Sequence, residues 1–209
     1  MFDIDGTITR IDDIIHTMQE EFPDFKLEHY TDYDLKISLV ANGFLGKSSK
    51  FSTGQFLRKY PLLFLDGVPR NHIGDYFTKI HKENHHIEFV TARYHTDERY
   101  NYTLDWSNKH FPNIQMCRSN LHFIDANAKH HHVIKALLDA KSTQTKTVVH
   151  FYEDKSETLF NTIEAYKRMN NLVDLEEFGE LRLYLIETPY SPKQITEDIK
   201  VVKCWSELL

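Results

Sequence analysis

Few glycines, few prolines and only two cysteines mark this sequence of 209 residues, which also lacks any long hydrophobic run. Cys117 and Cys204 form no short-spaced metal or redox motif, and two cysteines are too few for a disulfide-rich scaffold. A reducing intracellular compartment is favoured, with a single disulfide bond left open. No apolar run approaches the roughly 18 residues of a membrane span, and we expect no signal peptide before the first motif. We therefore expect a cytoplasmic protein without a membrane partner. The stub before Asp3 leads us to expect a natural chain that begins upstream of Met1.

An excess of positive charge is also missing, because the formal net charge is −6. This argues against long nucleic acid as the main partner but is compatible with a mononucleotide, whose charge a metal ion and a few cations can meet. The apolar fraction of 41% and the charged fraction of 27% are ordinary for a globular protein. Thirteen histidines are many, but they are scattered, and the run 130–132 is expected to be solvated.

The hydrophobic pattern alternates between strands and helices, which predicts an α/β fold of three layers around an open parallel sheet. About 80 residues separate the first strand from the next convincing one, and a simple crossover needs far fewer. We therefore expect a small helical cap over residues 11–68, inserted into a core domain of residues 1–10 and 69–209. The later strands are expected at 87–91, 114–117, 148–152 and 181–186, the core helices at 69–83, 97–111, 128–140 and 156–170, and a loop with a terminal helix or an extended tail at 192–209.

Two carboxylates, Asp3 and Asp5, stand one residue apart at the end of the first strand, and Gly6 follows. Alternate residues of an extended segment share a face, so we expect both carboxylates to point the same way. Like charges held so close need a cation or a proton to neutralise them, and oxygen ligands suit Mg²⁺. An acidic surface turn is the alternative for this dipeptide pattern alone.

Two more strands end in polar residues. Thr91 closes the strand at 87–91, and Glu153 and Asp154 follow the strand at 148–152. Ligands of open α/β sheets bind beyond the carboxyl ends of the strands, where the strand order switches. If these strands are neighbours, their carboxylates converge on one cation; the alternative for Glu153 and Asp154 is to cap the next helix.

The segment Asp-Ile-Asp-Gly-Thr-Ile-Thr at 3–9 resembles the first motif of the haloacid dehalogenase (HAD) superfamily of phosphohydrolases. The resemblance implies that Asp3 is the nucleophile that forms an aspartyl-phosphate and that Asp5 is the general acid and base. It implies that Thr91 binds a phosphoryl oxygen. It also implies that Asp154, with Asp3 and Asp5, holds Mg²⁺. Glu153 departs from the pattern, since relatives often have Asp there; it either reaches the metal or holds the catalytic lysine.

The same resemblance requires a cation beside the phosphoryl group, because the charge on its oxygens must be offset. Lys129 is our choice, at the start of a predicted helix, and Lys135 and Lys146 are the competitors.

Phe64-Leu65-Asp66-Gly67-Val68-Pro69, Phe89-Val90-Thr91-Ala92-Arg93 and Thr103-Leu104-Asp105-Trp106 are similar in layout to the 5'(3')-deoxyribonucleotidase branch of that superfamily. This similarity implies a nucleotide monophosphate as substrate, bound with the help of Ala92 and Arg93; Arg93 alternatively pairs with a carboxylate. Cap aromatics such as Phe44, Phe51 and Phe56 either stack a base or form the core of the cap.

We therefore expect a Mg²⁺-dependent phosphomonoesterase with a small phosphorylated substrate. A polynucleotide 3'-phosphatase is the second hypothesis, suggested by Glu-Asp-Lys-Ser at 153–156, and a non-catalytic HAD-like binding module is the third. The oligomeric state is left open.

Overall fold

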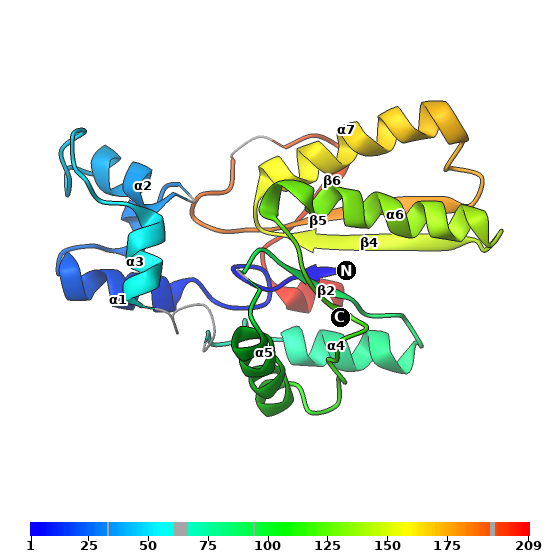
Figure 1. Ribbon diagram of the computed structural model, residues 1–209, viewed down its shortest axis with the longest axis horizontal. Coiled ribbons are helices and arrows are strands. Elements are labelled where there is room, and N and C mark those ends of the chain that lie inside the picture. The colour runs from blue at the N-terminus through cyan, green and yellow to red at the C-terminus, as the bar shows by residue number, and fades with distance from the viewer. Residues whose placement is uncertain (33, 61–66, 94, 193–194) are drawn as a thin grey trace.

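A computed structural model describes residues 1–32, 34–60, 67–93, 95–192 and 195–209. The chain folds into a six-stranded parallel sheet with helices on both faces, in a three-layer, Rossmann-like α/β arrangement (Figure 1). The strands are β1 (Phe2–Asp3), β2 (Phe89–Thr91), β3 (Leu121–Phe123), β4 (Thr147–Glu153), β5 (Gly179–Ile186) and β6 (Ile199–Val202). The α-helices are α1 (Asp12–Glu21), α2 (Leu35–Ala41), α3 (Thr53–Lys59), α4 (Ile73–Lys82), α5 (Asp97–His110), α6 (Lys129–Ser142) and α7 (Ser156–Val173). Short 3₁₀ turns are η1 (Leu27–His29), η2 (Ala126–Ala128) and η3 (Trp205–Leu208).

The strand order is β3-β2-β1-β4-β5-β6, and every neighbouring pair is parallel. Chain order runs outward to β3 on one side of β1 and outward to β6 on the other. The switch in strand order therefore lies between β1 and β4, whose registers pair Phe2 with Tyr152. In open sheets of this kind the ligand crevice lies at the carboxyl ends of the strands at this switch.

Each face of the sheet buries its own hydrophobic core. Helices α4 and α5 and the turn η3 cover one face, where Phe2 packs on the rings of Phe77 and Tyr152. Helices α6 and α7 cover the other, where Val90, Val133 and the strand residues of β4 and β5 meet. Burying both faces explains why β4 reads as a nearly continuous apolar run instead of an alternating one.

The helices α1, α2 and α3 lie to one side of the sheet, beyond the carboxyl ends of the strands (Figure 1). They share a third core, centred on Met18, Phe25, Leu39 and Phe56. These three helices lie within the predicted cap range 11–68, and a bridge between Thr9 and Pro69 joins the chain where it leaves and re-enters the core. Of the segment that supported the nucleotidase resemblance, residues 64–66 lie outside the described residues.

The local sequence explains several helix ends. Thr96 caps α5 by accepting a hydrogen bond from the backbone N–H of Arg99, and Asp97 and Glu98 in the first turn favour the positive end of the helix dipole. Asp125 accepts from the backbone N–H of Asn127 at 2.8 Å, which initiates the turn that leads into α6. Asp125 therefore caps η2 and not α6, whose N-cap residue, Ala128, makes no side-chain capping hydrogen bond.

The predicted third strand at 114–117 is wrong. Ile114 and Met116 are buried, but Cys117 and Asn120 close a turn in which the Asn120 side chain accepts from the Cys117 N–H at 2.7 Å. The strand begins only after this turn, as β3. Its central residue, His122, is polar, so the segment does not form an apolar run that would predict a strand.

The tail at 192–209 contains a sixth strand that the sequence pattern did not predict. β6 pairs with β5 from Leu183↔Ile199 onward and forms the edge of the sheet. β6 is only four residues long, which is too short for a clear alternation of apolar and polar residues in the sequence. None of the described helices combines the length and the apolarity that crossing a bilayer requires.

Candidate functional site

The first motif sits at the centre of the sheet. β1 ends at Asp3, and the backbone then turns back, with the N–H groups of Ile8 and Thr9 donating to the carbonyl of Ile4. Gly6 occupies this turn at φ +78°, and a Cβ there would lie 2.2 Å from the Oδ2 atom of Asp154. Only glycine fits this turn, because it must combine a left-handed backbone with close approach to a carboxylate.

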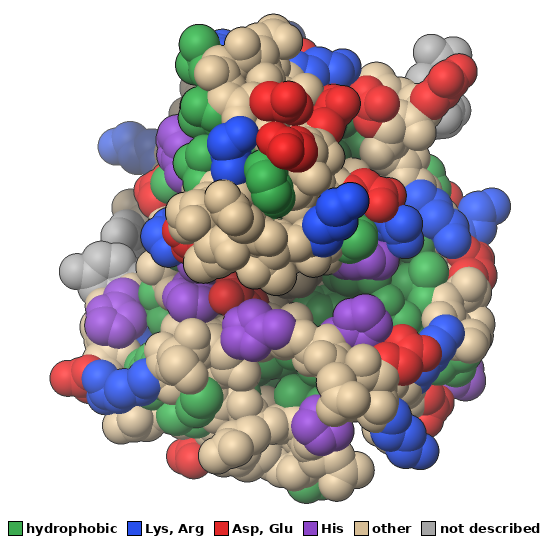
Figure 2. All heavy atoms as spheres, turned by 90° about the vertical axis from the view of Figure 1, so that its right-hand side faces the viewer, with side chains coloured by type: hydrophobic (Ala, Val, Ile, Leu, Met, Phe, Trp, Pro, Cys, Tyr) green, Lys and Arg blue, Asp and Glu red, His purple; other side chains and the backbone are tan. Residues whose placement is uncertain are grey.

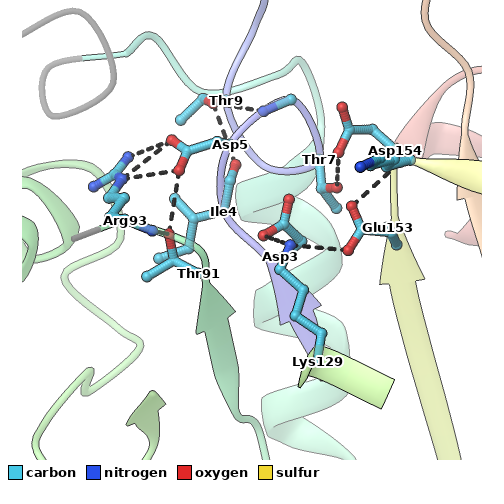
Figure 3. A network of polar contacts seen from close by, with 12 residues as sticks. Asp3, Ile4, Asp5, Thr7, Thr9, Thr91, Arg93, Lys129, Glu153 and Asp154 are labelled. Atoms are coloured by element: carbon cyan, nitrogen blue, oxygen red, sulfur yellow. Dashed lines mark hydrogen bonds and ion pairs between the residues drawn. The ribbon is translucent and has the colours of Figure 1, made fainter. Parts of the chain in front are cut away.

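Lys129 joins two strand ends. Its Nζ donates to Asp3 Oδ1 at 2.6 Å and to Glu153 Oε2 at 2.9 Å, across the switch between β1 and β4 (Figure 3). All three side chains are at most 6% exposed. Lys135 instead pairs with Asp139 on the surface, and Lys146 is exposed at the amino end of β4. Of the three lysines considered, Lys129 is thus the one that contacts the predicted nucleophile.

Asp154 completes an acidic cluster with Asp3 and Glu153. One carboxylate oxygen from each lies within 4.8 Å of the others, so the three side chains are close enough to share an ion. Thr7 donates to Asp154 Oδ1 at 3.3 Å, and the Tyr190 hydroxyl donates to Oδ2. The Asp5 side chain, predicted as a metal ligand, does not belong to this cluster.

Burial dominates the electrostatics of the cluster. It raises the pKa of Asp3 to about 8, with the charge of Glu153 adding to the effect and Lys129 opposing it. Burial likewise raises the pKa of Glu153 to about 7 and that of Asp154 to about 6. The pKa of Lys129 is held well above its usual range: burial lowers it, but the charges of Asp3 and Glu153 outweigh burial. Three carboxylates facing one ammonium leave an excess of negative charge that a divalent cation would offset.

Asp5 points away from Asp3, toward β2 (Figure 3). Arg93 donates to the Asp5 carboxylate through Nε at 3.0 and 3.1 Å and through Nη2 at 2.7 Å. Thr91 Oγ1 donates to the same carboxylate at 3.2 Å. The expectation that Asp3 and Asp5 share a face is therefore wrong. The strand ends at Asp3, so the alternation of side chains no longer holds at Asp5. Arg93 pairs with a carboxylate, which is one of the two roles predicted for it. Ala92, which lies between Thr91 and Arg93 in the sequence, is exposed.

The cap contributes to the same region. Phe56 is buried in the cap core, and Phe44 and Phe51 pack against it, which supports the interpretation of these rings as cap core. The ring of Tyr190 lies 5.1 Å from that of Tyr30 in an edge-on contact. Because Tyr190 also donates to Asp154, one side chain links the cap core to the acidic cluster.

Sequence reasoning missed two residues of this site. Tyr190 comes from the connection between β5 and β6, a segment without any motif. Arg70 donates through Nε to the Gly6 carbonyl at 2.8 Å and thereby supports the turn that carries the first motif. A basic residue directly after Pro69, at the return from the cap, was the available signal for Arg70.

A separate hollow lies at the amino ends of the strands, and histidines gather around it (Figure 2). Its lining includes Phe2, Tyr76, His150 and Tyr152, together with the rejected candidate Lys146, but none of the other predicted site residues. We therefore identify the candidate site by the charged side chains that gather at the carboxyl ends of the strands, and not by the size of a cleft.

Comparison with protein-family models and with curated proteins gives no match for this chain. The resemblance described above thus rests on the chain's own residues.

Proposed function

We propose that the chain is a Mg²⁺-dependent phosphomonoesterase that hydrolyses a nucleotide monophosphate through an aspartyl-phosphate on Asp3. One observation carries the proposal: Lys129 bridges Asp3 and Glu153, with Asp154 within sharing distance of an ion, at the switch point of a parallel sheet. A nucleophile, a fixed cation and a set of hard oxygen ligands are the parts that phosphoryl transfer requires.

The donor set fits Mg²⁺. Asp3 and Asp154 would hold the ion, with Glu153 bound chiefly to Lys129, and all donors are carboxylate oxygens. When bound, Mg²⁺ supplies positive charge to the phosphoryl oxygens. The raised pKa values of the three carboxylates express the same need for positive charge.

The residues divide the chemistry between them. An Asp3 oxygen forms a bond to phosphorus while the bond from phosphorus to the ester oxygen breaks, and Asp5 gives a proton to the departing oxygen. Asp5 then takes a proton from a water molecule whose oxygen attacks the same phosphorus, which releases inorganic phosphate and restores the Asp3 carboxylate. Lys129 offsets charge near the nucleophile throughout. Because Arg93 donates hydrogen bonds to both oxygens of Asp5, the steps in which Asp5 gives and takes a proton require this contact to loosen.

The cap and the overall charge support the proposed substrate class. Helices α1 to α3 stand beyond the strand ends, and the Tyr30–Tyr190 contact reaches the acidic cluster, so a small phosphate ester fits better than a long strand. The net charge of −6 favours the same choice. A polynucleotide 3'-phosphatase is the weaker candidate for these reasons.

The test is phosphate release from p-nitrophenyl phosphate, with Mg²⁺ and with a chelator. We expect Mg²⁺-dependent turnover that Asp3→Asn reduces to background, while Asp139→Asn, which changes an exposed carboxylate, leaves it intact. Turnover retained in Asp3→Asn would refute the mechanism. Absence of turnover in a wild-type chain that still binds Mg²⁺ would favour the non-catalytic module.

The substrate class is tested separately. Nucleoside 5'- and 3'-monophosphates are compared with 3'-phosphorylated oligonucleotides and with sugar phosphates. We expect a mononucleotide to be the best substrate; preference for the oligonucleotide would select the end-repair hypothesis, and preference for a sugar phosphate would overturn both nucleotide hypotheses.

A further inference from the structure

Three residues from distant parts of the chain converge beneath the start of α6. Glu88 directly precedes β2, His122 is the middle residue of β3, and His132 lies in the first turn of α6. Leu121 and Phe123 face the core under α4 and α5, so the alternation of the strand turns His122 toward α6. Glu88 shares this face with Val90, which belongs with Val133 to the core beneath α6 and α7.

The ligand atoms of this group are closely spaced. His132 Nε2 lies 3.0 Å and His122 Nε2 lies 4.0 Å from the same oxygen of Glu88. The two imidazole rings are 4.3 Å apart between centroids. Zinc binds histidine nitrogen and carboxylate oxygen at about 2.0–2.2 Å, so neighbouring ligands of a tetrahedral ion lie about 3.3 Å apart. The observed separations bracket this value.

One atom of the group is unsatisfied. Within the part of the chain that the structure describes, His122 Nε2 is buried and has no hydrogen-bond partner. A buried imidazole nitrogen without a partner is costly. The bond between His132 and Glu88 leaves this cost in place, whereas an ion between the three side chains would remove it.

We propose that Glu88, His122 and His132 form a second metal site, for a divalent ion of the zinc class. Two imidazoles and one carboxylate favour Zn²⁺ over Mg²⁺, which prefers oxygen ligands. The three side chains are 20–26% exposed, which leaves room for water as a further ligand.

The surroundings support the same ligand set. His86 Nε2 lies 3.1 Å from the other oxygen of Glu88 and orients the carboxylate from outside. Glu88 and His86 also line the hollow of Figure 2, which gives an ion a path from solvent. Lys135, a cation on the same helix, has its charge offset by Asp139 at 2.7 Å. Of the histidine run expected to be solvated, His131 is exposed, but His132 is turned inward.

The bound ion would tie α6 to the β2–β3 half of the sheet. Because Lys129 and His132 are three residues apart on α6, they lie on one face of the helix. The proposed zinc site therefore fixes the same helical turn that delivers Lys129 to Asp3, and it does so whether or not the phosphatase proposal holds.

The experiment is a Zn²⁺ titration of the full chain by calorimetry, after chelation and with Mg²⁺ in excess to occupy the acidic cluster. The variant His132→Gln keeps a side-chain amide that can donate to Glu88 but removes a metal-binding nitrogen. His131→Ala is the matched control on the same helix. The unfolding temperature of each metal-free protein verifies that the variants fold.

We expect one Zn²⁺ per chain, with a raised unfolding temperature, in the wild type and in His131→Ala. In His132→Gln we expect the affinity to fall by more than about 100-fold and the stabilisation to disappear, because a ligand is lost and not merely a supporting contact. Equal Zn²⁺ binding by His131→Ala and His132→Gln would overturn the proposal, as would a wild type that binds no Zn²⁺.

Discussion

Replacing Lys129 by Met removes a buried charge while keeping most of the side-chain volume. Asp3 and Glu153 would then lose hydrogen bonds of 2.6 and 2.9 Å and the cation that offsets them. Breaking a buried ion pair by removing one partner costs about 3–5 kcal/mol. In a chain of this size each kcal/mol shifts the unfolding temperature by about 2–4 °C, so we expect Lys129→Met to lower it by about 6–20 °C near pH 8.

The drop in unfolding temperature caused by Lys129→Met should be larger at high pH than at low pH. Burial raises the pKa values of Asp3 to about 8 and of Glu153 to about 7 in the folded chain, above their unfolded values. Such groups destabilise the fold only when ionised, so the free energy of unfolding falls as pH rises from about 4 to about 8. Removing the Lys129 charge raises both pKa values further, which makes the fall steeper. Near pH 5.5 the carboxyls carry protons and the loss should shrink.

Thermal unfolding of the metal-free protein, followed by circular dichroism at pH 5.5 and pH 8, measures both effects. Lys135→Met is the control, because it removes an exposed lysine from the same helix and should change the unfolding temperature little at either pH. The reasoning is refuted if the two variants behave alike at pH 8, or if the loss in Lys129→Met is the same at both pH values.

Two further predictions concern stability. Gly6→Ala should destabilise the chain more than Gly43→Ala: both glycines have φ +78°, but a Cβ at Gly6 meets Asp154 at 2.2 Å, whereas none of the described atoms lies within 4 Å of one at Gly43. Equal losses in denaturant unfolding would mean that the contact with Asp154 does not matter. In the wild type without metal, the unfolding temperature should fall between pH 6 and pH 8, since Asp3, Glu153 and Asp154 ionise there, and Mg²⁺ at pH 8 should restore it. A flat profile, or no response to Mg²⁺, would contradict the acidic cluster as a cation site.

The sequence predicted the parts of this arrangement that follow from local rules. Asp3 and Asp154 come together because the carboxyl ends of neighbouring parallel strands meet at one edge of the sheet. Lys129 was located by the predicted start of a helix between the third and fourth strands, where α6 begins. These inferences needed only the strand and helix positions, not the path of any loop.

The missed features depend on tertiary context. Asp5 points in an unexpected direction because the extended strand ends at Asp3, and at Asp5 the chain has already entered the turn that contains Gly6. The contact of Tyr190 with Asp154 depends on the route of the β5–β6 connection. The meeting of Glu88, His122 and His132 depends on the register between β2 and β3 and on the rotation of α6, neither of which a single sequence displays.

The position of β1 at the middle of the sheet has a consequence for how the chain is made. Asp3 is translated before its partners, since Lys129 follows 126 residues later and β4 later still. The opening strand must stay unpaired on one side while most of the chain is synthesised. Contacts so distant in sequence form slowly, and exposed strand edges invite wrong associations in the interval. Asp3 is thus translated well before the partners with which it would carry the proposed chemistry, and the site is assembled late.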